Sequence, residues 1–68
     1  MSEQIKRAFT FHEPKGDQAK RYSCIRDTAK SFALVIESLC PESRERSLAM
    51  TRLEEVVMWA NAAIARNE

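Results

Sequence analysis

Residues that interrupt helices are confined to two places in this 68-residue sequence. Pro14 and Gly16 stand close together near the start, and Pro41 stands alone further along. The stretches 17–40 and 44–67 contain neither residue type, and each is long enough for about six helical turns. This spacing of proline and glycine predicts an all-α chain in which a sharp turn joins two long helices.

The residues around these breaks give the expected boundaries of each element. Residues 1–9 are predicted to form a short helix, because their apolar side chains share one face, and 10–16 are expected to form a loop. Asp17 and Ser43 are the side chains expected to cap the two long helices. Because only three residues separate the long helices, they are expected to run antiparallel as a helical hairpin, within a single domain that spans 1–68.

Apolar residues in both long segments recur at intervals of three and four, the spacing that gives a helix one apolar stripe. The expected stripe of the first segment is Tyr22, Ile25, Ala29, Phe32, Ile36 and Leu39, and that of the second is Met50, Leu53, Val57, Ala60 and Ile64. Residues 56–64, with Met58 and Trp59, are apolar nearly all round, and such a helix is usually buried on more than one side. This favours contacts between subunits. The alternative is that Trp59 covers the hairpin beneath the N-terminal segment.

A domain of this size is marginally stable alone and usually needs a disulfide, a metal, very good packing or self-association. Cys24 and Cys40 would lie roughly 24 Å apart along one helix, whereas a disulfide needs Cα atoms within about 7 Å. Free thiols fit a reducing, cytoplasmic setting. His12 is the single histidine, and no cluster of soft ligands has zinc spacing. Helix packing and self-association are therefore the expected sources of stability.

Charge and composition disfavour several classes of function. The formal net charge is +1, with 11 basic and 10 acidic residues, and that balance argues against a protein that binds duplex nucleic acid through many phosphates. No apolar run approaches the roughly 20 residues that span a bilayer. Glu54 and Glu55 would point about 100° apart on a helix, so they do not form a facing carboxylate pair. Neither an enzyme nor a bound cofactor is expected.

Aromatic and basic residues near the loop give the chain a possible ligand site. Phe9, Phe11 and His12 lie before or within the loop, and Arg26 and Lys30 follow on the first long helix. Rings near guanidinium and ammonium groups suit a ligand that contains purines and phosphates. The alternatives are that the two phenylalanines fix the loop onto the hairpin, that His12 makes a hydrogen bond within the loop, and that the basic pair is a solvated face.

Several segments together resemble the small phage anti-CBASS proteins of the second type, which are cyclic-oligonucleotide sponges built on a helical hairpin domain. The resemblance covers nearly the whole chain, and the run 53–67 is its longest and most specific part. The shorter segments are Phe9-Thr10-Phe11-His12 with Pro14, then Tyr22 and Arg26, and then Cys40-Pro41-Glu42-Ser43-Arg44-Glu45.

The resemblance implies a compact homohexamer, arranged as a trimer of dimers, in the cytoplasm of an infected bacterium. It implies that the protein sequesters cyclic dinucleotides such as 3′,3′-cGAMP without cleaving them, so that CBASS effectors are not activated. Some members also take cyclic trinucleotides such as cyclic tri-AMP. By position, Phe11 is similar to the aromatic residue that stacks on the bases, Arg26 to the basic residue that supports the site, and Arg66 to the arginine of a trinucleotide site.

Two positions depart from the family pattern. The aromatic position is often tyrosine, so Phe11 retains stacking but lacks the hydroxyl. Arg26 in place of lysine changes a point charge into a planar fork. The residue pattern and the resemblance together give the candidate ligand-binding residues as Phe9, Phe11, His12, Pro14, Tyr22, Arg26, Lys30 and Arg66.

One rival interpretation keeps the same helices and changes the partner. A helical interaction module could dock its apolar face on a host or phage protein, with the aromatic residues serving as core. A small nucleic-acid-binding protein is a weaker rival, because the chain has no basic recognition stripe.

Overall fold

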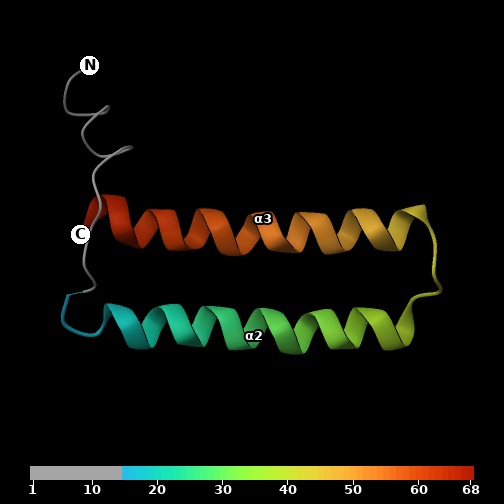
Figure 1. Cartoon of the computed structure of the whole chain (residues 1–68), viewed down its shortest axis with the longest axis horizontal. Coiled ribbons are helices and arrows are strands. Elements are labelled where there is room, and N and C mark those ends of the chain that lie inside the picture. Colours follow the sequence, from blue (N-terminus) through green and yellow to red (C-terminus); the bar gives the residue numbers. More distant parts are fainter. Residues whose placement is uncertain (1–14) are drawn as a thin grey trace, which may run out of the picture.

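The computed structural model describes residues 15–68, which form a helical hairpin (Figure 1). Helix α2 spans Gln18–Leu39 and helix α3 spans Arg44–Asn67, and the two run antiparallel side by side. The two long helices of the predicted hairpin are thus confirmed, and no strand occurs within residues 15–68. The short helix expected at 1–9 and residues 10–14 of the expected loop lie outside the described part of the chain.

A glycine turn leads into α2. Gly16 has a φ of 55°, in the left-handed region that favours glycine. Asp17 occupies the N-cap position as predicted, but its side chain makes no capping hydrogen bond. The side chain of Gln18 is used instead, because its Oε1 accepts a hydrogen bond from the backbone N–H of Lys15 at 2.8 Å. Asp17 pairs with Arg21, one turn further on, at 3.2 Å.

The turn between the helices satisfies the backbone groups on both of its sides. Pro41 disfavours helical geometry in the residue before it, and Cys40 is accordingly extended, with φ −109° and ψ 132°. The hydroxyl of Ser43 accepts a hydrogen bond from the backbone N–H of Arg46 at 3.1 Å and so caps α3. The guanidinium of Arg46 donates to the carbonyl oxygens of Glu37, at 3.4 Å, and Cys40, at 3.2 Å. Arg46 therefore caps the end of α2 from the start of α3.

The helices meet along one line of half-buried side chains. The expected stripe of α3 is confirmed, since all five of its residues are half-buried. On α2 the predicted stripe is wrong at two residues, because Phe32 is 55% exposed and Leu39 is 77% exposed. Ala33 is half-buried at the turn where Phe32 was expected, because a second helix covers only a narrow strip of the first. The small Ala33 fits that strip, and the larger Phe32 lies beside it.

The hairpin alone leaves many of its large apolar side chains exposed. Among residues 15–68 no hydrophobic side chain is fully buried, and Gln18 is the one residue that is. Trp59 is 61% exposed and Val56 is 60% exposed. Neither described helix is long and apolar enough to cross a bilayer.

Candidate functional site

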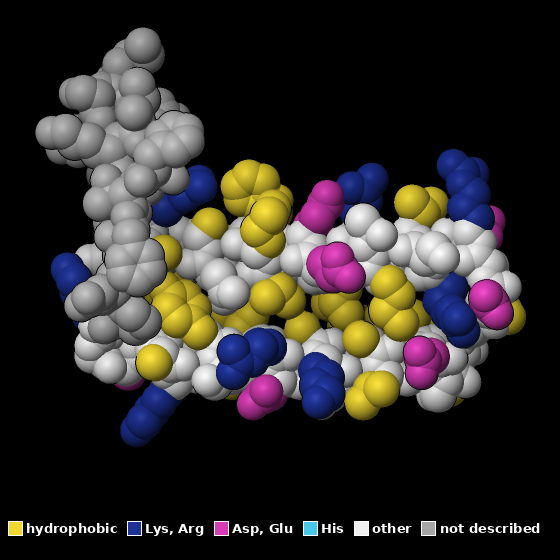
Figure 2. Space-filling model, in the orientation of Figure 1, with side chains coloured by type: hydrophobic (Ala, Val, Ile, Leu, Met, Phe, Trp, Pro, Cys, Tyr) yellow, Lys and Arg dark blue, Asp and Glu magenta, His cyan; other side chains and the backbone are white. Residues whose placement is uncertain are grey.

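A groove of about 320 Å³ runs between the two helices and is the best candidate for a ligand site. Its volume falls at the lower end of the roughly 300–1,000 Å³ typical of small-ligand pockets. Figure 2 shows apolar side chains between the helices and charged side chains along their flanks. The lining residues are Arg26, Ala29, Lys30 and Ala33 from α2, and Met50, Leu53, Glu54 and Val57 from α3.

Two cations form the α2 wall of this groove. Arg26 and Lys30 lie four residues apart and therefore on one face of the helix. Both are exposed, and the guanidinium of Arg26 donates a hydrogen bond to the hydroxyl of Ser23 at 3.3 Å. That contact uses one terminal nitrogen, so other N–H groups of Arg26 can meet a phosphate. This wall can bind an anion.

The α3 wall of the groove carries a carboxylate. Glu54 lines the groove opposite the two cations. Within residues 15–68 it forms no ion pair. Its neighbour Glu55 instead accepts two contacts from Arg52, at 3.1 and 2.9 Å. Glu54 is exposed and lines the groove, whereas Glu55 is held by Arg52 outside it.

The structure brings together only part of the predicted ligand site. Arg26 and Lys30 line one groove, and Tyr22 is half-buried on α2, one turn before Arg26. Arg66 lies in the last turn of α3 and does not line this groove. The remaining candidates, which are Phe9, Phe11, His12 and Pro14, lie outside residues 15–68.

A second groove, of about 450 Å³, has an almost wholly apolar lining. It shares Ala29, Leu53 and Val57 with the first groove, so the two lie on either side of the line where the helices meet. Its other lining residues are Cys24, Ile25, Thr28, Phe32, Val56 and Ala60. Cys24, like Cys40, is a free and exposed cysteine. This second surface carries no charge that could position an ionic ligand.

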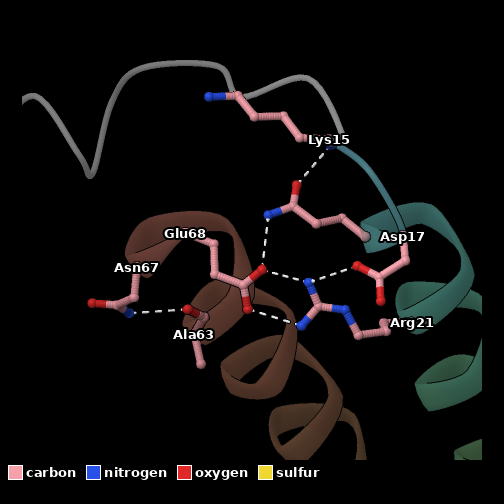
Figure 3. A network of polar contacts seen from close by, with 7 residues as sticks. Lys15, Asp17, Arg21, Ala63, Asn67 and Glu68 are labelled. Carbon is pink, nitrogen blue, oxygen red and sulfur yellow. Dashed lines mark hydrogen bonds and ion pairs between the residues drawn. The ribbon is translucent and has the colours of Figure 1, made fainter.

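The open end of the hairpin is held by a polar cluster that sequence patterns did not indicate (Figure 3). The guanidinium of Arg21 forms an ion pair with the carboxylate of Glu68, and its Nη1 lies 2.8 Å from Oε2. The side-chain amide of Gln18 donates to the same carboxylate at 3.3 Å. These hydrogen bonds, chiefly the one from Arg21, lower the pKa of Glu68 from 4.5 to about 2. The pairing could have been predicted from the antiparallel arrangement, because it puts Arg21 near the start of α2 beside Glu68 at the end of α3.

Two asparagines of α3, Asn61 and Asn67, differ in whether their side chains form hydrogen bonds within the described residues. The side-chain amide of Asn67 donates to the carbonyl oxygen of Ala63, one turn earlier, at 3.0 Å. Asn61 interrupts the apolar residues of α3. Its Oδ1 is buried but accepts no hydrogen bond from the residues that the structure describes. No group of three or more potential metal-ligating side chains occurs among those residues.

The chain is a small helical hairpin with a groove lined by charged and apolar side chains and with a large accessible apolar surface. The chain matches the family model described as Acb2/Tad1, hairpin domain, over residues 1–65. It therefore belongs to this family, which comprises the anti-CBASS 2 cyclic-oligonucleotide sponge proteins, as its sequence segments indicated. No curated protein and no solved structure gives a significant match to the chain.

Proposed function

We propose that this protein binds 3′,3′-linked cyclic dinucleotides such as 3′,3′-cGAMP and returns them intact, so that CBASS effectors in an infected bacterium are not activated. Family membership implies a sponge for cyclic oligonucleotides. The observation that supports a phosphate-bearing ligand most directly is the placement of Arg26 and Lys30 on one wall of the groove.

The groove offers separate surfaces for the parts of a nucleotide. Arg26 presents a planar fork that suits two phosphate oxygens, and Lys30 adds a compact charge. The floor formed by Ala29, Leu53 and Val57 is apolar and can contact the face of a base. Sequestration requires tight binding and slow release rather than chemistry on the ligand.

The N-terminal residues complete the proposed site. Phe11 stacks on a base, a contact worth about 1–3 kcal/mol per base. Phe9, His12 and Pro14 are proposed to contribute to the same site, as is Tyr22, which lies one turn before Arg26 on α2. This part of the proposal rests on the family resemblance, since residues 1–14 lie outside the described structure.

The protein is further proposed to assemble as a hexamer, a trimer of dimers. The exposed apolar side chains support self-association, because a two-helix hairpin of this kind has no buried hydrophobic core within residues 15–68. The apolar groove with Phe32 and Val56 is one surface that a second copy could cover. Patches of this kind commonly mark protein interfaces.

Symmetry relates the proposed assembly to two classes of ligand. A two-fold axis offers each contacting residue twice and suits a cyclic dinucleotide, whereas a three-fold axis suits a cyclic trinucleotide such as cyclic tri-AMP. Arg66, exposed in the last turn of α3, is the residue proposed for the trinucleotide site. Saturation with a dinucleotide should then leave trinucleotide binding intact, and direct displacement would contradict two separate sites.

Isothermal titration with 3′,3′-cGAMP tests the function. We expect tight binding with about one ligand per two chains, and intact nucleotide recovered after the protein is denatured. Cleaved nucleotide would contradict sequestration without catalysis. If neither a cyclic dinucleotide nor a cyclic trinucleotide bound, and one protein partner co-purified in stoichiometric amount, the chain would instead be a helical interaction module.

A further inference from the structure

The charge distribution of the groove does not suit a ligand that is anionic throughout. Arg26 and Lys30 on the α2 wall favour phosphate, but Glu54 on the α3 wall presents a negative charge to the same space. Glu54 is exposed, and within residues 15–68 no cation pairs with it. A phosphate that approached this wall would be repelled. The carboxylate is therefore suited to a part of the ligand that donates hydrogen bonds.

The neighbouring Glu55 shows that position on the helix decides what each carboxylate can do. Glu55 follows Glu54 directly, so its side chain points about 100° away around the helix. It is held by Arg52 at 2.9 Å and does not line the groove. The two glutamates thus differ in what they face, although they are identical in charge and nearly identical in position along the chain.

We propose that Glu54 is a specificity-determining residue that recognises the Watson–Crick edge of guanine in the bound cyclic nucleotide. This inference rests on the proposed function and names the base that the groove selects. An ionised carboxylate only accepts hydrogen bonds, and its two oxygens can accept a pair of parallel donors. The N1–H and N2–H groups of guanine present two such donors side by side.

Adenine does not match Glu54 in the same way. Its Watson–Crick edge pairs one donor, the N6 amino group, with one acceptor, the N1 lone pair. The N1 lone pair would face a carboxylate oxygen and be repelled. In this arrangement the phosphate contacts the cations of the α2 wall, and the edge of guanine contacts Glu54 on the α3 wall. The face of the guanine ring lies on the apolar floor formed by Ala29, Leu53 and Val57.

The test compares c-di-GMP, 3′,3′-cGAMP and c-di-AMP by isothermal titration with the full chain and with Glu54→Gln. The wild-type protein is expected to bind the two guanine-containing ligands more tightly than c-di-AMP. Glu54→Gln keeps the size of the side chain but replaces one acceptor by a donor. It should weaken c-di-GMP by at least about fivefold, the lower end for one bidentate base contact. It should not weaken c-di-AMP, because an amide no longer repels adenine N1 and can donate a hydrogen bond to it. Retained binding of c-di-AMP also shows that the variant is folded.

Glu55→Gln is the matched control, because it removes the same charge from the adjacent residue outside the groove. It should leave all three affinities unchanged. If Glu54→Gln tightened every ligand equally, Glu54 would act only through charge repulsion, and recognition of guanine would be overturned. Equal binding of all three ligands by the wild-type protein and by Glu54→Gln would overturn this inference alone. Failure of the wild-type protein to bind any cyclic oligonucleotide would overturn the proposed function with it.

Discussion

Arg21 and Glu68 stand 47 positions apart in the sequence, and their side chains join the two ends of the hairpin. Both terminal nitrogens of the guanidinium donate to the carboxylate, one to each oxygen. Gln18, the one buried residue of the described chain, donates to the same group. The contact joins the helices at the end opposite the turn, where the main chain does not connect α2 to α3.

This contact predicts a pH dependence of stability. The pKa of Glu68 is about 2 in the folded protein, below its ordinary value of 4.5. Between these values the unfolded chain binds more protons than the folded protein, so stability rises with pH in that window. The stabilisation is therefore complete above pH about 4.5 and is lost as the pH falls through about 2. The difference in Tm between the wild type and Glu68→Gln, followed by circular dichroism, should be largest near neutral pH and shrink over this range.

Glu42→Gln provides the comparison for that experiment, because Glu42 is an exposed residue in the turn at the other end of the hairpin. Its effect on Tm should be small across the same pH range. A wild-type advantage over Glu68→Gln that stayed constant down to pH 2 would show that the carboxylate of Glu68 is not held by Arg21 in solution.

The turn gives a second prediction, which concerns Arg46. Its guanidinium donates to two carbonyl oxygens at the end of α2, where a cation also interacts favourably with the helix dipole. Arg46→Met should lower the free energy of unfolding by about 0.5–1 kcal/mol, measured by urea denaturation. Arg44→Met removes the same charge from an exposed position two residues earlier. If both variants lost equal stability, the carbonyl contacts of Arg46 would not be responsible.

The sequence predicted what depends on local patterns and missed what depends on the pairing of the helices. Pro41 and Ser43 act on their own neighbours, and the observed start and end of the helices beside them follow directly. The choice between Phe32 and Ala33 on α2 cannot be made from periodicity, because intervals of three and four fit both. Only the partner helix decides which of the two faces it.

The same distinction applies to the candidate site. Arg26 and Lys30 were identified from their spacing and chemistry, and they do line one wall together. Spacing alone did not show that Glu54, and not Glu55, lines the groove, because Arg52 is close in sequence to both glutamates. The structure pairs Arg52 with Glu55, which requires side-chain directions that a spacing rule does not resolve. The loop aromatics, including Phe11, remain predictions from the sequence.

The exposed face of α3 gives a prediction about assembly. Trp59 is 61% exposed in the hairpin, and Val56 and Met58 of the same helix are exposed as well. Trp59→Ala should reduce the oligomer to smaller species or lower its Tm, as measured by light scattering coupled to size exclusion and by thermal melting. Thr51→Ala, an exposed position on the same helix, should leave both unchanged. A Trp59→Ala protein with unaltered mass and Tm would remove this face from the subunit interface.

The aromatic residue proposed to stack on the ligand can be tested directly. Phe11→Ala should lose at least about 1 kcal/mol of cyclic dinucleotide affinity, the lower end for one stacked base. Phe11→Tyr keeps the ring and adds a hydroxyl, so it should retain the stacking contribution. Titration calorimetry with 3′,3′-cGAMP measures both. An unchanged dissociation constant for Phe11→Ala would exclude Phe11 from the site.

The basic wall of the groove makes the last prediction, and two substitutions at Arg26 separate charge from geometry. Arg26→Gln removes a charged hydrogen-bonding group from the phosphate and should cost about 1.5–3 kcal/mol of binding free energy. Arg26→Lys keeps the charge but loses the planar fork, so its affinity should fall between those of Arg26→Gln and the wild type. The affinity of the wild type and of Arg26→Lys should decline similarly with added salt, and the affinity of Arg26→Gln should decline less steeply.

Lys20→Gln is the control, because it changes an exposed cation on α2 that does not line the groove. Titration with 3′,3′-cGAMP should find the affinity of Lys20→Gln close to that of the wild type. If Lys20→Gln weakened binding as much as Arg26→Gln, the ligand would respond to overall charge, and Arg26 would not contact a phosphate in the groove.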